Sequence, residues 1–329
     1  MRLNLLLFAV LSALATSLLA AQPAPQPAGK PEPAKVAPVK PRLELSAELR
    51  EFRKTAIPVQ FPSNGLTLHG WIYKPQGTGP FPAVVWNHGS EQEPTAHPDL
   101  GKFYTSHGFV LFLPVRHGHK PSPGEYIQDV IDRFQSQARD RTSFQKKVVE
   151  LQDVYNQDVV AAIRWIQEQP FVDRKHIVVT GCSYGGIQTL LTAEQNLGVS
   201  AFVSFAPGAM SWANVELRNR LLTAVRAAKA PVFLIQAEND YNLGPSEVLG
   251  PVIRAQGFLN RAKVYPAFGT THQEGHAGFA CWEEGIAIWG PDVLDFLAQA
   301  GVPAPIPTAR PAAAPSPQPE PRRPKKPPN

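Results

Sequence analysis

Cysteine is scarce in this sequence of 329 residues, which contains only Cys182 and Cys281. A metal site built on cysteine needs several closely spaced thiols, so these two residues do not form one. The histidines His117 and His119 lie two positions apart, but no nearby cysteine or carboxylate completes a ligand set. We therefore expect no metal and no other cofactor.

A strong charge of one sign is also absent, since the formal net charge is only +5. Part of that charge comes from the basic C-terminal segment that ends "PEPRRPKKPPN". A charge carried in this way is weak support for nucleic-acid binding. We expect no nucleic-acid partner.

The sequence lacks an apolar run suited to a permanent membrane span. The run near its start, "LLLFAVLSALATSLLA", is short for a span and has no basic stop after it. Arg2 before the run and the small residues Ala20 and Ala21 after it are typical of a cleavable signal peptide. We predict a signal peptide over residues 1–21 and a secreted or periplasmic mature protein without stable membrane insertion; a retained anchor is the alternative.

Two segments contain too few apolar residues to form a core. Residues 22–42 are rich in Pro, Ala and Lys, and residues 303–329 are rich in Pro and basic residues. Such segments are typical of extended linkers and disordered tails. The remaining residues, 43–302, contain no internal repeat and have the length of one catalytic α/β domain.

Within this domain, segments with strand patterns alternate with segments with helix patterns, which predicts a mostly parallel central sheet with helices on both faces. The segments Ala56–Phe61 and Leu66–Tyr73 flank a turn signal, "PSNG", and predict an antiparallel hairpin at one edge. The other expected strands are Pro82–His88, Phe109–Val115, Ile177–Thr180, Ser200–Pro207, Val232–Gln236 and Ala262–Phe268. The expected helices are Leu100–His107, Phe144–Gln169, Ile187–Gln195, Ser246–Asn260 and Ala280–Ala300, and residues 125–147 are a candidate helical flap.

The stretch "IVVTGCSYGGIQTLL" places a buried strand directly before a helix. A strand that turns at once into a helix presses its backbone against its neighbours, and small residues relieve that crowding. Gly181 and Gly185 lie two positions before and after Ser183, as in the Gly-x-Ser-x-Gly nucleophile elbow. We predict that Ser183 is a nucleophile held on this turn.

A serine nucleophile needs a base, and the base needs an acid that orients it. Asp240 follows the strand Val232–Gln236 and is our candidate for the acid, with Glu238 as the alternative. His276 follows the last strand between two glycines and is our candidate for the base, with His272 as the alternative.

A hydrolytic site also needs donors for the oxyanion that forms during acyl transfer. We expect one from the backbone N–H of Tyr184, directly after the nucleophile, and one from the backbone N–H of Ser90 in the loop "NHGSE". His88 in that loop suits a structural role. If Cys182 and Cys281 lie near this site they could pair in an oxidising compartment, but we favour two separate buried thiols.

These motifs, in this order, resemble the α/β-hydrolase superfamily, and more narrowly the dienelactone hydrolase family and its prolyl-oligopeptidase-like relatives. The resemblance covers about residues 55–300 and depends on "NHGS", "RHGHKPSPGEY", "GCSYGG", "QAENDYN" and "EGHAGF". It implies the α/β-hydrolase fold, with Ser183, Asp240 and His276 as the catalytic triad. The namesake enzymes use a cysteine nucleophile, so the serine found here favours ordinary carboxylic esters over dienelactone.

The expected function is therefore that of a serine hydrolase that cleaves small esters through an acyl-enzyme. The alternatives are a serine peptidase and a non-catalytic, envelope-tethered binding protein. Tyr241 and Trp212 are candidate substrate contacts at the rim. Arg116 is a further candidate, because its guanidinium would bind a substrate carboxylate if its loop folds over the serine; a salt bridge that fixes the loop is the alternative.

Overall fold

A computed structural model describes residues 44–257 and 259–303. The described residues all belong to one compact unit. The predicted signal peptide, the predicted linker and the predicted tail, except its first residue, lie outside them. Within these ranges, no helix is both long and apolar enough to cross a membrane.

The strands of the described residues form one eight-stranded sheet with the order β1-β2-β4-β3-β5-β6-β7-β8. β2 pairs antiparallel with β1 and with β4, and the remaining neighbours pair in parallel. This confirms the predicted mostly parallel sheet. The strands are β1 (Ile57–Ser63), β2 (Leu66–Tyr73), β3 (Phe81–Asn87), β4 (Val110–Val115), β5 (Val172–Cys182), β6 (Ala201–Phe205), β7 (Val232–Ala237) and β8 (Arg261–Tyr265).

The hairpin at the edge of the sheet has a two-residue turn. Asn64 and Gly65 have φ angles of 46° and 78°, and Ser63 pairs with Leu66 across the turn. Positive φ at both central residues is typical of the tight turns that match the twist of a hairpin. The predicted antiparallel hairpin is therefore confirmed.

The central strands are covered on both faces, as their unbroken apolar sequences require. Every residue of β3, β4, β6 and β7 is buried. One face packs on α4, α5, α6 and α7, and the other on α2, α8 and α9. The helices are α1 (Ala47–Arg53), α2 (Pro98–Ser106), α3 (Ile127–Gln137), α4 (Arg141–Gln167), α5 (Tyr184–Ala193), α6 (Val215–Arg226), α7 (Gly244–Ala255), α8 (Phe279–Cys281) and α9 (Glu283–Gln299), with a 3₁₀ turn, η1 (Ala209–Ser211), and a π-helical turn, η2 (Glu274–Gly278).

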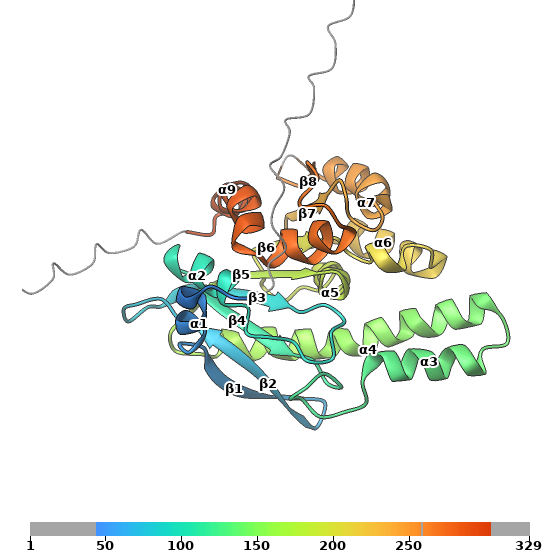
Figure 1. The fold of residues 1–329 in the computed structure, drawn as a ribbon, viewed down its shortest axis with the longest axis horizontal. Coiled ribbons are helices and arrows are strands. Elements are labelled where there is room, and N and C mark those ends of the chain that lie inside the picture. The colour runs from blue at the N-terminus through green and yellow to red at the C-terminus, as the bar shows by residue number, and fades with distance from the viewer. Residues whose placement is uncertain (1–43, 258, 304–329) are drawn as a thin grey trace, which may run out of the picture. The chain divides into compact units, whose positions relative to one another are not determined.

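The region expected to form a helical flap is a helical hairpin. Figure 1 shows α3 and the first part of α4 side by side, extending beyond the sheet. The long helix starts at Arg141, earlier than the predicted Phe144, because the Asp140 carboxylate accepts a hydrogen bond from the Ser143 N–H at 2.8 Å. An aspartate in this position satisfies a backbone donor that the helix itself leaves free.

Candidate active site

Ser183 lies on the turn between β5 and α5, as the glycine spacing predicts. Its φ and ψ angles are 59° and −116°, a conformation that is rare for a residue with a side chain. The Ser183 N–H donates to the Phe205 carbonyl at 3.0 Å, and the Ser183 carbonyl accepts from the Ile187 N–H at 3.1 Å. The turn is therefore held by a neighbouring strand on one side and by the helix on the other.

The two glycines of the motif are required by close backbone contacts. A Cβ atom at Gly185 would lie 1.9 Å from the Asn87 carbonyl oxygen, and one at Gly181 would lie 2.6 Å from the same oxygen. Both distances are far shorter than a van der Waals contact. The backbone of the elbow thus packs directly on the end of β3, and any larger residue would displace Ser183.

Asp240 and His276 contact each other, as predicted. His276 Nδ1–H donates to Asp240 Oδ1 at 2.7 Å, and this oxygen also accepts from the Tyr241 N–H at 2.7 Å. The second oxygen, Oδ2, accepts from Gln236 Nε2 at 2.7 Å. Because both oxygens are engaged, the carboxylate is fixed in a single orientation.

Gln236 is a residue of the site that the sequence analysis missed. Its Nε2 also donates to the Asn242 carbonyl at 2.9 Å, and its Oε1 accepts from the N–H and hydroxyl of Ser246 at 2.9 and 2.7 Å. It therefore ties the strand β7, the loop with Asp240 and the start of α7 together. A glutamine inside an otherwise apolar strand was the available signal.

His276 lies in η2 and is 4% exposed. Its Nε2 atom is buried and has no hydrogen-bond partner among the described residues. His276 and Ser183 line the same pocket, of about 750 Å³. With Nδ1 bound to Asp240, the imidazole has its second nitrogen free for a partner in that pocket.

The alternatives for the acid and the base are held elsewhere. Glu238 is exposed, and its backbone N–H donates to the Tyr265 carbonyl at 2.9 Å. His272 is exposed and donates from Nδ1 to the Asn239 carbonyl at 2.9 Å. Neither side chain contacts the Asp240–His276 pair through a hydrogen bond in the described part of the chain.

The candidate oxyanion donors come from two segments, the loop after β3 and the start of α5. Gly89 and Ser90 line the pocket beside Ser183. Tyr184 is the first residue of α5, where the backbone N–H groups of a helix have no partner within the helix. A hole of two backbone donors would use one N–H from each segment.

The predicted substrate contacts do not line the pocket. Arg116 is 1% exposed, and its guanidinium contacts the Gly89 carbonyl and the Tyr184 ring. Trp212 is 6% exposed and packs in the apolar core against α6 and α7. Tyr241 is partly exposed and its ring packs edge-on against His276, with centroids 5.3 Å apart.

Cys182 and Cys281 are both free thiols that line the pocket. The pairing considered from the sequence is therefore not formed; Cys182 is buried, as the favoured alternative had it, whereas Cys281 is only partly buried. Burial raises the pKa of both thiols, so both are protonated at neutral pH. A protonated thiol is a poor nucleophile, which leaves Ser183 as the better candidate at the elbow.

The two histidines considered for a metal face different partners. His117 Nδ1 donates to Asp158 Oδ2 at 2.5 Å, and His119 Nδ1 donates to the Glu91 carbonyl at 2.7 Å. In residues 44–257 and 259–303, no group of three or more His, Cys, Asp or Glu side chains is arranged to hold a metal ion.

Comparison with known proteins identifies the family. The sequence pattern of the dienelactone hydrolase family matches residues 68–283. This chain belongs to that family. The predicted family and the α/β-hydrolase fold are therefore confirmed.

Several relatives and solved structures show what this family member resembles. A polyketide transferase from a Penicillium species is 30% identical over 160 residues, 48% of this chain and 47% of the relative. An acetyl esterase from Xylanibacter ruminicola is 26% identical over 149 residues, 43% of this chain and 33% of the relative. The chain thus matches less than half the length of these curated relatives. Esterase 2 of Thermogutta terrifontis has the same fold, with a TM-score of 0.54 at 18% identity over 76% of this chain and 97% of its own.

Proposed function

We propose that this protein is a serine hydrolase that cleaves carboxylic esters through an acyl-enzyme. The observation that carries the proposal is the geometry of His276. Its Nδ1 is bound to a fixed carboxylate, its buried Nε2 has no partner among the described residues, and His276 lines the same pocket as Ser183. This is the arrangement that a base for a serine hydroxyl requires.

In the first half of the reaction, Ser183 Oγ attacks the carbonyl carbon of the ester while His276 Nε2 takes the hydroxyl proton. The carbonyl oxygen becomes negative and accepts hydrogen bonds from the backbone N–H groups of Tyr184 and Ser90. The Asp240 carboxylate stabilises the imidazolium that forms. Collapse of the intermediate breaks the ester bond, and His276 returns the proton to the departing alcohol.

In the second half, water attacks the acyl group on Ser183. His276 takes a proton from that water, and the new tetrahedral oxyanion uses the same two donors. Collapse releases the carboxylic acid and restores the Ser183 hydroxyl with the proton held by His276. The cycle uses only residues of this chain and water.

The test compares the full chain with Ser183→Ala on p-nitrophenyl acetate and on a peptide p-nitroanilide. We expect hydrolysis of the ester and a fall in kcat of at least roughly 10³-fold in the variant. Mass spectrometry of the quenched and digested protein should show an acetyl group on the peptide that contains Ser183. Faster hydrolysis of the anilide would favour a peptidase. Equal rates for the two proteins would exclude Ser183 as the nucleophile, and no hydrolysis of either substrate by the wild type would leave only a binding role.

We also propose that the protein is exported. The support is the N-terminal sequence, in which a basic residue, a short apolar run and Ala20–Ala21 follow one another. Expression of the full chain in a bacterial host should give a product that lacks the first 21 residues by intact-mass measurement. A product that retains Met1 in the membrane fraction would contradict the proposal.

A further inference from the structure

Arg116 directly follows β4 and is among the largest fully buried side chains of the protein, at 1% exposure. Among the described residues, its guanidinium forms no salt bridge with an aspartate or glutamate, and its Nε and one terminal nitrogen have no hydrogen-bond partner. Burying a charge in this way is unfavourable for folding. A specific use of that charge would explain why the site holds an arginine.

One edge of the guanidinium contacts the loop that contains Gly89 and Ser90, the loop of the first candidate oxyanion donor. The second terminal nitrogen of Arg116 donates to the Gly89 carbonyl at 2.6 Å. The Arg116 backbone N–H donates to His88 Nε2 at 3.2 Å, so His88 carries its proton on Nδ1 and donates it to the same Gly89 carbonyl at 2.9 Å. The Gly89 carbonyl is therefore fixed by two donors on the buried side of the loop.

Fixing this carbonyl also fixes the donor that faces the substrate. The Gly89 carbonyl and the Ser90 N–H belong to one peptide group, and in a trans peptide they point in opposite directions. Because the carbonyl points inward to Arg116, the Ser90 N–H points outward, on the side of the loop that lines the pocket. A hydrogen bond from a cation to the carbonyl also polarises the peptide group and makes its N–H a stronger donor.

The same guanidinium contacts Tyr184, the residue of the second candidate oxyanion donor. Its central carbon lies 4.8 Å from the ring centroid of Tyr184, which is a cation–π contact. The Tyr155 ring packs edge-on against Tyr184 from α4, with centroids 6.2 Å apart, so the helical hairpin covers this contact. Arg116 thus packs against both segments that supply the candidate donors.

Arg116 carries the positive charge of this region by itself. Burial, then the nearby Arg116 charge, lowers the pKa of His88 well below its ordinary value and that of His119 to about 3. Both imidazoles are therefore neutral at neutral pH. The Glu91 and Asp158 carboxylates act on the Arg116 charge from a distance but form no salt bridge with it among the described residues. A cation behind two backbone donors favours a negative charge in front of them.

We infer that Arg116 is a positioning residue that aims the Ser90 N–H, supports Tyr184 and favours the oxyanion through its charge. The inference rests on the proposed ester hydrolysis at Ser183. It assigns Arg116 an effect on the transition state and none on a substrate carboxylate.

The test measures p-nitrophenyl acetate hydrolysis by the full-length wild type, Arg116→Met and Arg116→Lys. We expect Arg116→Met to lower kcat roughly 10- to 100-fold with KM changed less than about threefold. The variant keeps the Ser90 N–H and loses only its support, which should cost less than removing an oxyanion donor altogether. Arg116→Lys keeps the charge and should recover part of the rate. The inhibition constant of methylboronic acid, which forms an anionic tetrahedral adduct on serine, should rise by about the same factor as kcat/KM falls.

The controls separate this inference from the proposed function and from a general loss of structure. If Ser183→Ala matches the wild type, the proposed function fails and the inference fails with it. If Ser183→Ala is inactive while Arg116→Met retains wild-type kcat and inhibitor affinity, only the inference on Arg116 is overturned. Should Arg116→Met not fold, Arg116→Lys decides by the same two readouts, and equal kcat and inhibitor affinity to wild type would overturn the inference.

Discussion

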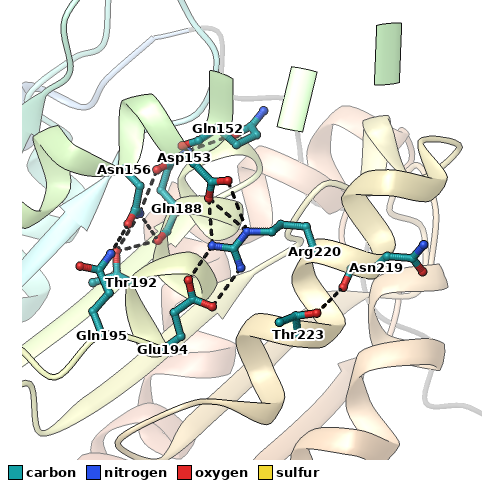
Figure 2. Close-up of polar contacts among 10 residues, drawn as sticks. All are labelled: Gln152, Asp153, Asn156, Gln188, Thr192, Glu194, Gln195, Asn219, Arg220 and Thr223. Atoms are coloured by element: carbon teal, nitrogen blue, oxygen red, sulfur yellow. Dashed lines mark hydrogen bonds and ion pairs between the residues drawn. The ribbon is translucent and has the colours of Figure 1, made fainter. Parts of the chain in front are cut away.

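Two arginines contact opposite ends of the helix α5 that follows Ser183: the buried Arg116 contacts Tyr184 at its start, and the partly buried Arg220 contacts Glu194 at its end. They differ in their partners. Arg220 from α6 contacts Asp153 on α4 and Glu194 at the end of α5, with N–O distances of 2.9 and 2.5 Å (Figure 2). Arg116 contacts a carbonyl group and an aromatic ring and has no carboxylate within salt-bridge distance among the described residues.

The surroundings shift the pKa values of the two arginines in opposite directions. The hydrogen bonds that Arg220 donates to Glu194 first, and then to Asp153, raise the pKa of Arg220, whereas burial lowers the pKa of Arg116. A paired arginine such as Arg220 joins helices, and its positive charge is offset by its carboxylate partners. An unpaired one leaves a field that acts on its neighbours, and here the neighbours are the elbow and the oxyanion loop.

The Arg220 side of α5 also contains a network of amide side chains. Asn156 Nδ2 donates to the carbonyl and side chain of Gln188 and to Thr192, each at 3.0 Å (Figure 2). Gln188 in turn donates to the carbonyl and side chain of Gln152 at 3.1 Å. These bonds lock α5 to α4, so we expect this side to determine stability and the Ser183 side to determine the rate.

The largest expected effect is on the Ser183 side. His276→Ala should lower kcat for p-nitrophenyl acetate at least roughly 10³-fold, because the serine loses its base. His272→Ala is the matched control and should stay within about twofold of wild type, since His272 is exposed and bonds only to a loop carbonyl. A greater loss in His272→Ala would exchange the two roles.

The second effect concerns the buried imidazoles around Arg116. His88 and His119 have lowered pKa values, about 3 for His119, whereas both bind a proton near pH 6.5 in the unfolded chain. Below pH 6.5 the unfolded state therefore binds more protons, and stability falls as pH falls toward the folded pKa. Each group should contribute up to about 1.4 kcal/mol per pH unit to this loss.

Urea unfolding of the wild type at pH 7 and pH 5 measures this loss. His119→Gln should reduce the difference between the two pH values. His272→Gln, at an exposed position, should leave it unchanged. An equal pH dependence in wild type and His119→Gln would show that His119 becomes charged in the folded protein.

The residues of the candidate active site were predictable because each depends on local rules. The elbow follows from two glycines around Ser183, and Asp240 and His276 follow strands whose carboxyl ends meet at one edge of the sheet. Gln236 was missed because a pattern of apolar residues treats a buried amide as an irregularity. Its role appears only when the loop with Asp240 is folded next to it.

The direction of the Arg116 loop was not predictable in the same way. It depends on the helical hairpin, whose residue Tyr155 packs on Tyr184, and this contact joins segments far apart in the sequence. The helices α1 and α6 were missed although Ser46 and Asn214 accept hydrogen bonds from the third residue of each helix. A capping residue without a strong periodic pattern was too weak a signal for a helix of 7 or 12 residues.

A smaller effect is expected on the other side of α5. Arg220→Met should lower the free energy of unfolding by about 1–2 kcal/mol, because it leaves two partly exposed carboxylates without their cation. The kcat for p-nitrophenyl acetate should stay within about twofold of wild type. Urea unfolding and ester turnover on the same preparation test both parts. A loss of turnover as large as that of Arg116→Met, with stability unchanged, would contradict the division between the two sides.

The smallest expected effect concerns substrate charge at the mouth of the pocket. With Arg116 buried, the pocket residue Glu91 is an exposed carboxylate that forms no salt bridge among the described residues. It should repel an ester that carries a carboxylate by about 1 kcal/mol through water, or about fivefold in affinity. Glu91→Gln should therefore lower KM for mono-(p-nitrophenyl) succinate a few-fold and leave KM for p-nitrophenyl butyrate, of similar size, unchanged. Added salt should reduce the difference between the wild type and the variant, since it screens exposed charges. If the succinate ester is instead the better substrate of the wild type at low salt, a cation must reach the pocket, and Arg116 would again be the first candidate.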